Sequence, residues 1–251
     1  MPKNNPTTEI RQSPVRCTDC PVRQKALFQV VAEDYLSDAE SRRTGQYEIA
    51  ARSELYRESS LANMAYTLFE GWLLLYRTHS DGSRQGLRVA LPGDFVGYAA
   101  LSQENYTHSA LAITDVVVCG FSQADLHAMI DRHADIGRRI TSIQGDDLVK
   151  CESHILGLGR KSAEQRIAFA VADLFHRLDQ RGQVDHANRR MPFPLTQEML
   201  GELTGLTPVH TNRVLRKLRS EGVMSCDRQR IDVHDLSRLS EIGEYTPKRA
   251  G

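Results

Sequence analysis

The stretch that decides the fold is Leu195 to Val223, with the sequence LTQEMLGELTGLTPVHTNRVLRKLRSEGV. Apolar residues recur at steps of three and four in each half of it, which predicts two short amphipathic helices. Thr196 can cap the first helix, and Thr207 followed by Pro208 marks the start of the second, because proline suits a first helical turn. Gly205 permits the sharp change of direction between them. Two helices joined by a short turn that contains glycine form the helix-turn-helix unit.

The second of these helices has an outward face suited to the major groove of DNA. Arginine offers a forked pair of donors to guanine, asparagine can pair with adenine, and valine can contact the methyl group of thymine. We therefore expect the base edges to be contacted by Val209, Asn212 and Arg213. Contacts to the DNA backbone are expected from polar and basic side chains around both helices, namely Thr196, Gln197, Thr207, His210, Arg216 and Lys217.

A short hairpin follows the second helix. Met224 to Val233 alternates in the manner of two strands and places Arg228 and Arg230 near the tip, as in the wing of a winged helix domain. The alternative interpretation is an ordinary corner of two helices with a solvated basic face. Because turn, caps, basic face and hairpin agree, the pattern favours DNA binding.

Charge is distributed unevenly along the chain of 251 residues. The 32 Lys and Arg balance 32 Asp and Glu, and a net charge of zero alone would argue against a nucleic-acid partner. Residues 160–251, however, hold 16 basic and 12 acidic side chains, whereas residues 1–159 hold 16 and 20. Residues 207–230 hold six basic and two acidic ones. The positive field is therefore confined to the predicted recognition helix and wing.

Length and apolar content indicate two domains of ordinary size, each with a core of its own. The sequence contains no run of 18 apolar residues, and its start lacks the apolar segment of a signal peptide. We therefore expect a cytoplasmic protein without membrane contact. In that compartment the five cysteines favour reduced thiols, metal ligands or redox sensors over a disulfide framework.

Between about Gly45 and Phe121 the pattern changes to short stretches of β-branched and aromatic residues separated by turns. Gly71 is expected to support a tight turn or bulge. Strands at this spacing favour a small antiparallel roll or jelly roll, which can enclose one small ligand. The clearest predicted strands are residues 66–69, 72–77, 87–90 and 115–121.

A long helix is predicted to join the two regions, from about Ile136 to Leu158. Its apolar side chains are either buried against the roll of the same chain or paired with a second copy in a homodimer, and we favour the homodimer. Gly157 and Gly159 are expected to interrupt the helix and form a hinge before Ser162, which caps the next helix. The stripe consists of Ile136, Ile140, Ile143, Leu148, Cys151, Ile155 and Leu158.

These predictions give an α+β fold in four parts. Residues 1–21 are a flexible arm with the pair Cys17-Thr-Asp-Cys20, and residues 22–135 form a β-roll sensor domain. Residues 136–159 form the dimerisation helix and hinge. Residues 160–251 form a winged helix-turn-helix domain for DNA binding.

Five features together resemble the CRP/FNR superfamily of bacterial transcription regulators. They are the stretch Leu-Pro-Gly-Asp-Phe-Val-Gly at 91–97, the cysteine pair, the roll, the long helix and the C-terminal domain. The resemblance covers nearly the whole chain. It implies a regulator and not an enzyme, with a homodimer on a two-fold symmetric operator and RNA polymerase as a further partner. An effector in the N-terminal domain would shift the long helix and hinge.

Cyclic nucleotide is not expected as the effector. In the cyclic-nucleotide members a glutamate after the Gly-Asp-Phe-x-Gly stretch holds the ribose, and an Arg-Ser pair holds the phosphate. This sequence has Tyr98 at the first position and His108-Ser109 at the second. Without that arginine a buried phosphate would lack its counter-charge.

The oxygen-sensing members suggest an iron–sulfur cluster as the cofactor. Cys17, Cys20 and Cys119 match three of the four cysteines that hold it, and the missing one would lie near Ala26. A cluster here would need another ligand, such as Asp19 or a histidine, or would be of a smaller type. Thiol sensing without metal, and a Cys119 that is only a small buried apolar residue, stay open as alternatives.

Two further cysteines were considered as redox thiols. Cys151 lies in the apolar stripe, where a two-fold axis could bring it near its copy. Cys226 lies in the wing near Arg228, which is expected to lower the pKa of the thiol. His79 and His108 are conceivable haem ligands, as in a carbon-monoxide-sensing branch of the superfamily, but neither is placed strongly.

The favoured function is a DNA-binding transcription regulator that responds to oxygen or redox state through cysteines of its N-terminal domain. The recognition helix keeps the family arginine as Arg213, whereas Val209 replaces a glutamate, so the half-site should differ at that base pair. One alternative is a regulator of the same family controlled by a small ligand in the roll or by its own level. A distant alternative is a thiol redox enzyme that uses Cys17 and Cys20, although these lie outside a βαβ unit.

Overall fold

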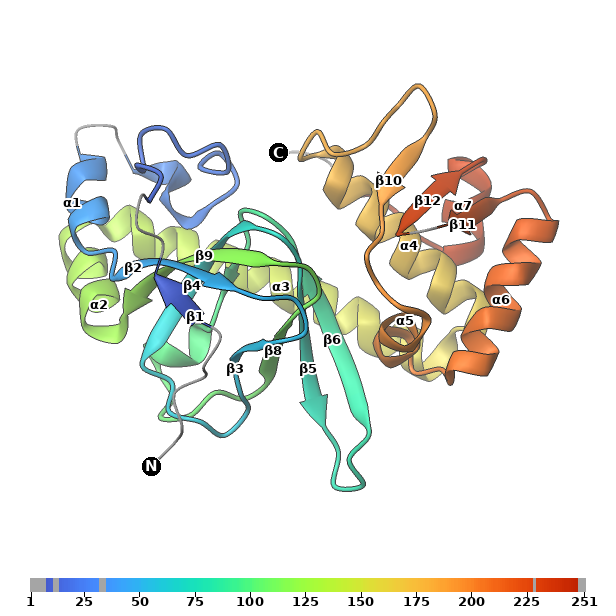
Figure 1. Cartoon of the computed structure of the whole chain (residues 1–251), viewed down its shortest axis with the longest axis horizontal. Helices are drawn as coiled ribbons and strands as arrows, with labels where there is room; N and C mark the ends of the chain where they lie inside the picture. Colours follow the sequence, from blue (N-terminus) through green and yellow to red (C-terminus); the bar gives the residue numbers. More distant parts are fainter. Residues whose placement is uncertain (1–7, 11–13, 32–34, 228, 248–251) are drawn as a thin grey trace. The chain divides into compact units, whose positions relative to one another are not determined.

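The computed structural model describes residues 8–10, 14–31, 35–227 and 229–247 (Figure 1). Residues 1–7 and 11–13 of the predicted flexible arm therefore lie outside the described residues, whereas Thr8–Ile10 of the arm form a strand. The chain divides into two compact units, Met1–Lys150 and Cys151–Gly251. Within the described residues, no helix has the length and apolar character needed to cross a bilayer.

The first unit is an antiparallel β-roll of two sheets, as the sequence predicts. A five-stranded sheet has the order β1-β2-β9-β4-β7, and a four-stranded sheet has the order β3-β8-β5-β6. The strands are β1 (Thr8–Ile10), β2 (Gly45–Ile49), β3 (Glu54–Tyr56), β4 (Met64–Glu70), β5 (Leu73–Thr78), β6 (Arg84–Ala90), β7 (Phe95–Val96), β8 (Ser109–Ala112) and β9 (Val116–Ser122). The turn between β4 and β5 requires Gly71, which has a φ of 84° and where a Cβ would lie 2.2 Å from the carbonyl oxygen of Asp115.

Two apolar clusters hold this unit together. The first fills the space between the sheets and includes Leu68, Leu73 and Val118. The second packs Phe95 and Phe121 against a layer of helices, because successive side chains of a strand point to opposite faces of the sheet. That layer consists of η1 (Leu27–Val30), α1 (Leu36–Ser41), α2 (Gln123–Arg132) and the start of α3 (Ala134–Arg160).

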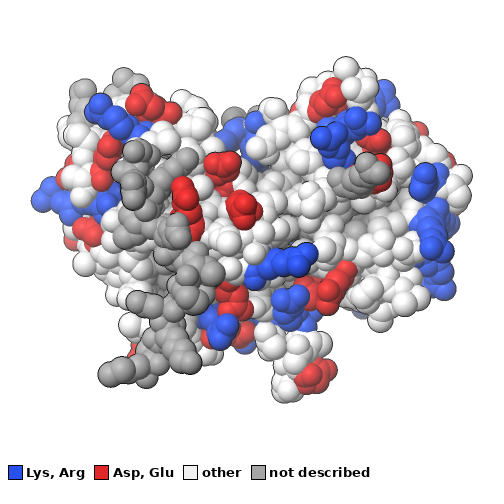
Figure 2. All heavy atoms as spheres, viewed as in Figure 1, with Lys and Arg blue, Asp and Glu red and all other residues white. Residues whose placement is uncertain are grey.

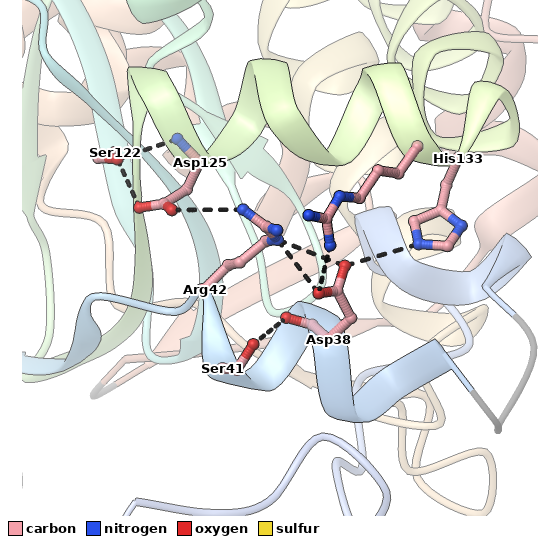
Figure 3. A network of polar contacts seen from close by, with 7 residues as sticks. Asp38, Ser41, Arg42, Ser122, Asp125 and His133 are labelled. Atoms are coloured by element: carbon pink, nitrogen blue, oxygen red, sulfur yellow. Dashed lines mark hydrogen bonds and ion pairs between the residues drawn. The ribbon is translucent and has the colours of Figure 1, made fainter.

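A polar network fixes α1 against α2 at the edge of this layer (Figure 3). The Nε of Arg42, the residue that caps the C-terminus of α1, lies 3.3 Å from a carboxylate oxygen of Asp38 in α1. Its Nη1 lies 3.8 Å from a carboxylate oxygen of Asp125 in α2. His133 lies 3.6 Å from the same Asp38 carboxylate. Ser122 caps α2 by accepting a hydrogen bond from the backbone N–H of Asp125. These contacts hold α1 against α2, and Glu40 of α1 in turn accepts a hydrogen bond from the backbone N–H of Cys17.

Helix α3 differs from its prediction at its C-terminal end. The expected interruption at Gly157 and Gly159 is wrong, because the helix continues to Arg160. A glycine costs a helix only about 1 kcal/mol relative to alanine, which neighbouring turns can offset. The helix ends where Ser162 begins a complete capping box with Gln165 at the start of α4 (Ala163–Asp179).

The apolar stripe of α3 has two different environments. Ile136 and Ile140 are buried in the apolar cluster of their own roll. Leu148 and Ile155 are 60% and 63% exposed in the single chain, and Cys151 is exposed between them. Burial against the roll therefore applies to the first half of the helix, and the second half is left open to a partner.

The second unit is a winged helix-turn-helix. Its core packs Val171 and Phe175 of α4 with Leu200, Leu218 and Leu239 from the other helices. Those helices are α5 (Gln197–Thr204), α6 (Pro208–Ser220) and α7 (Leu236–Gly243). The three-stranded sheet has the order β10-β12-β11, formed by β10 (Arg190–Pro192), β11 (Met224–Asp227) and β12 (Arg230–Val233).

Candidate DNA-binding surface and cysteine pocket

The turn between α5 and α6 is built as the sequence predicts. Thr196 accepts a hydrogen bond from the backbone N–H of Met199 at 3.1 Å, and Thr207 accepts one from His210 at 3.3 Å. Gly205 adopts the left-handed conformation with a φ of 65°. Both threonine hydroxyls keep a hydrogen that can be donated to a phosphate. The caps thus set the angle of α6 and leave its first turn accessible.

Helix α6 exposes the face that was predicted to read bases. Val209 is 82% exposed, which is unusual for a β-branched apolar residue on a helix with a separate buried face. Arg213 and Arg216 are exposed on the same side, and Val214 and Leu218 are buried on the other. Figure 2 shows Lys and Arg gathered along the edge where α6 lies in Figure 1. The helix therefore presents a basic face with an apolar contact point near its N-terminus.

Asn212 is tied to the preceding helix. Its side-chain N–H donates to the Oε1 of Gln197 at 2.9 Å. The Oδ1 atom and the second N–H of Asn212 are not used by this bond, so the amide still has donor and acceptor capacity for a base edge. Gln197 was predicted to contact the DNA backbone, and in the structure it also orients Asn212.

Lys217 lies at the flank of this face and is held by carboxylates. Its Nζ is 2.5 Å from Glu164 of α4 and 3.6 Å from Glu221. The hydrogen bond from Lys217 to Glu164 raises the pKa of the lysine. Sequence reasoning missed Glu164 because it lies 53 residues before Lys217. No local pattern joins two residues that far apart.

The wing is the hairpin of β11 and β12. Arg230 is exposed beside its tip, and Arg228 lies outside the described residues. The expectation of a lowered thiol pKa at Cys226 is wrong, because partial burial and the charge of Asp227 raise that pKa. Although Cys226 is exposed as a residue, it is no activated thiolate.

Cys17, Cys20 and Cys119 line one pocket between the N-terminal segment and the five-stranded sheet. The two early cysteines and Gln46, all distant from Cys119 in sequence, thus line the same pocket as Cys119. The Nε2 of Gln46 donates to the Cys119 Sγ at 3.3 Å. The Oε1 of Gln46 accepts a hydrogen bond from the backbone N–H of Val15 at 2.9 Å. The structure therefore brings the three predicted cysteines together.

Two charged side chains hold the cysteine segment in place. Arg43 donates to the carbonyl oxygen of Val15 at 2.7 Å, and the backbone N–H of Cys17 donates to Glu40 at 3.0 Å. Burial raises the pKa of the Cys17 thiol to about 11, and Arg43 opposes this rise. Burial also raises the pKa of Cys20. Both thiols are therefore protonated near neutral pH and are poor nucleophiles in this state.

The pocket offers an incomplete ligand set for a four-cysteine cluster. Ala26 lines it with a methyl group, at the position where the family resemblance calls for the missing cysteine. Thr67 also lines it, and its Oγ1 is buried without a hydrogen-bond partner among the described residues. In the described part of the chain, no group of three His, Cys, Asp or Glu side chains is arranged to hold a single metal ion.

Aromatic side chains occupy the interior of the roll. Tyr56 stacks on Tyr106 with ring centroids 4.1 Å apart, and His108 lies 2.9 Å from the Tyr56 hydroxyl. Burial, assisted by the positive charge of Arg88, lowers the pKa of His108 to about 4, so the ring is neutral at physiological pH. His79 is exposed and pairs with Asp81 at 3.2 Å. His108, which the family resemblance aligns with the phosphate-binding pair, is thus hydrogen-bonded to a side chain of the roll itself.

A β-roll, a long helix and a winged helix-turn-helix together define a class of DNA-binding transcription regulators. Residues 47–133 match the family model described as a cyclic nucleotide-binding domain, and residues 165–242 match the Crp-like helix-turn-helix domain. The chain belongs to the CRP/FNR superfamily.

Named relatives and a solved structure agree with this assignment. The nitrogen fixation regulation protein FixK of Bradyrhizobium diazoefficiens is 28% identical over 90% of this chain and 93% of its own length. The transcriptional activator protein FnrL of Cereibacter sphaeroides is 28% identical over 90% of this chain and 91% of its own. The structure of FixK2 from Bradyrhizobium japonicum has a TM-score of 0.70 at 26% identity and covers 80% of this chain and 98% of the other.

Proposed function

We propose that this regulator acts in the cytoplasm as a homodimer, reads a two-fold symmetric operator and responds to oxygen or redox state through Cys17, Cys20 and Cys119. The observation that carries the proposal is the pairing of an exposed recognition face on α6 with three thiols that line one pocket of the roll. RNA polymerase is the proposed partner at the promoter.

The reading of bases is proposed for Val209, Asn212 and Arg213. Val209 and Arg213 are exposed and Asn212 is half-buried in the N-terminal half of α6, and this supports the proposal because recognition helices enter the major groove by that end. Backbone contacts are proposed for Thr196, Gln197, Thr207, His210, Arg216 and Lys217. Lys217 is the weakest of these, since a phosphate would compete with two carboxylates for its ammonium group.

The homodimer is proposed to form through the second half of α3. Leu148, Ile155 and Leu156 are each at least 58% exposed, although apolar side chains of this size are usually buried. A parallel helix pair would cover Leu148 and Ile155, which lie seven residues apart on one face. Helix-turn-helix dimers bind two half-sites about one turn of DNA apart, which suits a palindromic operator. Cys151 would lie in this interface.

Redox sensing is proposed for the cysteine pocket. An iron–sulfur cluster, when bound, would supply a group that oxygen degrades, with Cys17, Cys20 and Cys119 as its cysteine ligands. The chain's own contribution is to place Cys119 between Gln46 and Thr67 of the neighbouring strands, where Gln46 donates to its Sγ. The N-terminal segment that would carry two of these ligands is anchored at Val15 by Gln46 of the sheet and at Cys17 by Glu40 of α1.

A second candidate is the same regulator without a redox cofactor. Two observations favour it: Ala26 removes one cysteine ligand, and the raised thiol pKa of Cys17 makes that thiol unreactive at neutral pH. Activity would then depend on a small ligand or on the level of the protein.

The test is anaerobic purification of the full chain, followed by an absorbance spectrum, iron and sulfide analysis, and DNA binding before and after air. The DNA probe is selected by the protein from a random pool. We expect bound iron, loss of colour in air and a parallel loss of specific binding. Cys119→Ser should abolish all three, and Gln183→Ala, at an exposed position outside the pocket and the recognition helix, serves as the control. An iron-free protein with equal binding in both conditions would favour the second candidate.

A further inference from the structure

Helix α3 is connected to the roll by a polar contact in the middle of its length. The Nη2 of Arg88, on β6, lies 3.1 Å from the Oδ2 of Asp147, on α3. The hydroxyl of Tyr98, on η3 (Tyr98–Leu101), donates to the same Oδ2 at 3.4 Å. One carboxylate of the helix thus accepts from two different elements of the roll.

This contact is shielded and its arginine is fixed. The side chains of Arg88 and Asp147 are each only 18% exposed. Arg88 also lies 3.6 Å from Asp94 and donates to the carbonyl oxygen of Phe95 at 3.2 Å. Asp94 is itself held by the backbone N–H of Leu91 at 3.0 Å. A half-buried pair with a rigid partner is worth more than an exposed one, because water and salt screen it less.

The contact includes Tyr98, which by the family resemblance stands at the position of the ribose-binding glutamate. In this chain the hydroxyl of Tyr98 donates to a carboxylate of α3. Asp147 is the residue directly before Leu148, the first exposed apolar residue of the proposed dimer face. The carboxylate therefore fixes the rotation of α3 at the point where the helix leaves the roll.

We propose that Asp147 is a positioning residue that serves as an internal anionic ligand of the roll. Through Arg88 and Tyr98 it holds the middle turn of α3 on the roll without a bound effector, so that Leu148 and Ile155 face a second copy. The dimer part of this inference rests on the proposed homodimer, whereas the contact itself does not.

The experiment measures backbone hydrogen exchange of residues 140–150 in the full chain, and the dimer dissociation constant by sedimentation. Asp147→Asn and Arg88→Gln should each speed exchange and weaken the dimer about tenfold, the order of effect of one partly buried ion pair. In the double variant, exchange should be no faster and the dimer no weaker than in either single variant. Asp147→Glu, which keeps the carboxylate, should retain most of the protection from exchange. Lys150→Gln is the control, since Lys150 pairs with Asp147 at 3.1 Å within the same helix and adds no link to the roll.

Two results would overturn the proposed role of Asp147. Exchange in Asp147→Asn equal to the original chain, or effects that add in the double variant, would overturn the proposal. If the chain is monomeric, the proposed homodimer is wrong, and the exchange data still test the contact of Asp147 with Arg88 and Tyr98. If Asp147→Asn does not fold, Tyr98→Phe removes only one hydroxyl and should speed exchange in the same direction by a smaller factor; no change there would count against the inference.

Discussion

The side-chain N–H of Asn212 donates to the Oε1 of Gln197 at 2.9 Å, so the recognition helix and the helix before it share a polar contact on the surface proposed to face DNA. A predicted backbone-binding residue therefore also orients a predicted base-reading residue. This coupling gives Gln197 an influence on sequence discrimination that its position alone does not suggest.

We predict that Gln197→Ala weakens operator binding about threefold to tenfold and random-DNA binding less. The reason is that Asn212 loses the partner that holds its amide plane, and positioning of a bidentate donor–acceptor pair carries discrimination. Titration of both DNAs by fluorescence anisotropy measures this. Gln183→Ala, at an exposed position away from α6, is the control. Equal losses on the two DNAs would leave Gln197 with a backbone role only.

Arg213→Ala should cost about 1–3 kcal/mol per half-site and relax the preference for one base pair. The exposed guanidinium is placed to donate two parallel hydrogen bonds to a guanine, and alanine offers none. Binding to a panel of operators changed at each position of one half-site checks the prediction. A uniform loss across the panel and on random DNA would contradict base reading by Arg213.

Arg216 and Lys217 should differ in the salt dependence of binding. Arg216→Ala is expected to lower the slope of log K against log salt by about one for each half-site, because one phosphate contact is lost. Lys217→Ala should lower it by less, since Glu164 and Glu221 already neutralise that ammonium group. Affinities between about 50 and 200 mM salt measure both slopes. A larger change at Lys217 than at Arg216 would mean that DNA displaces the carboxylates.

The sequence predicts features that depend on neighbours along the chain. Thr196, Thr207 and Gly205 set the caps and the turn of the DNA-binding unit by local rules, and all three adopt the expected roles. Features that depend on tertiary contact were missed. The bond from Gln46 to Cys119 joins residues 73 apart, and that between Lys217 and Glu164 joins residues 53 apart.

The C-terminal end of α3 shows the same limit of prediction from local sequence. Two glycines in four residues predict a break, but a helix continues past glycine when its other residues can sustain it. Here the capping box at Ser162 decides where α3 stops and α4 begins. That Cys17, Cys20 and Cys119 belong to one site was predicted from the family resemblance alone. In the structure, the pairing of β2 and β9 places Gln46 beside Cys119, and the hydrogen bond from Val15 to Gln46 brings the cysteine segment to the same pocket.

Alkaline pH should destabilise the roll through Cys17. Burial raises the pKa of this thiol from 9.0 to about 11, so the folded chain holds the proton more tightly than the unfolded chain. The stabilisation is complete below about pH 9 and is lost as the pH rises to about 11. Urea unfolding followed by the fluorescence of Trp72, the single tryptophan, measures it. Cys17→Ser should remove part of the decline; an unchanged decline would assign it to other groups.

The exposed half of α3 gives the sharpest test of assembly. Leu148→Glu and Ile155→Glu should raise the dimer dissociation constant by about 100-fold or more, because a helix pair would bury both carboxylates without partners. The stability of the single chain should change little, since both side chains are more than half exposed in it. Sedimentation velocity and urea unfolding measure the two quantities. Ser142→Glu, at an exposed position on another side of α3, is the matched control. A dimer that tolerates glutamate at both positions must form elsewhere, and α3 would then need a different reason for its exposed apolar residues.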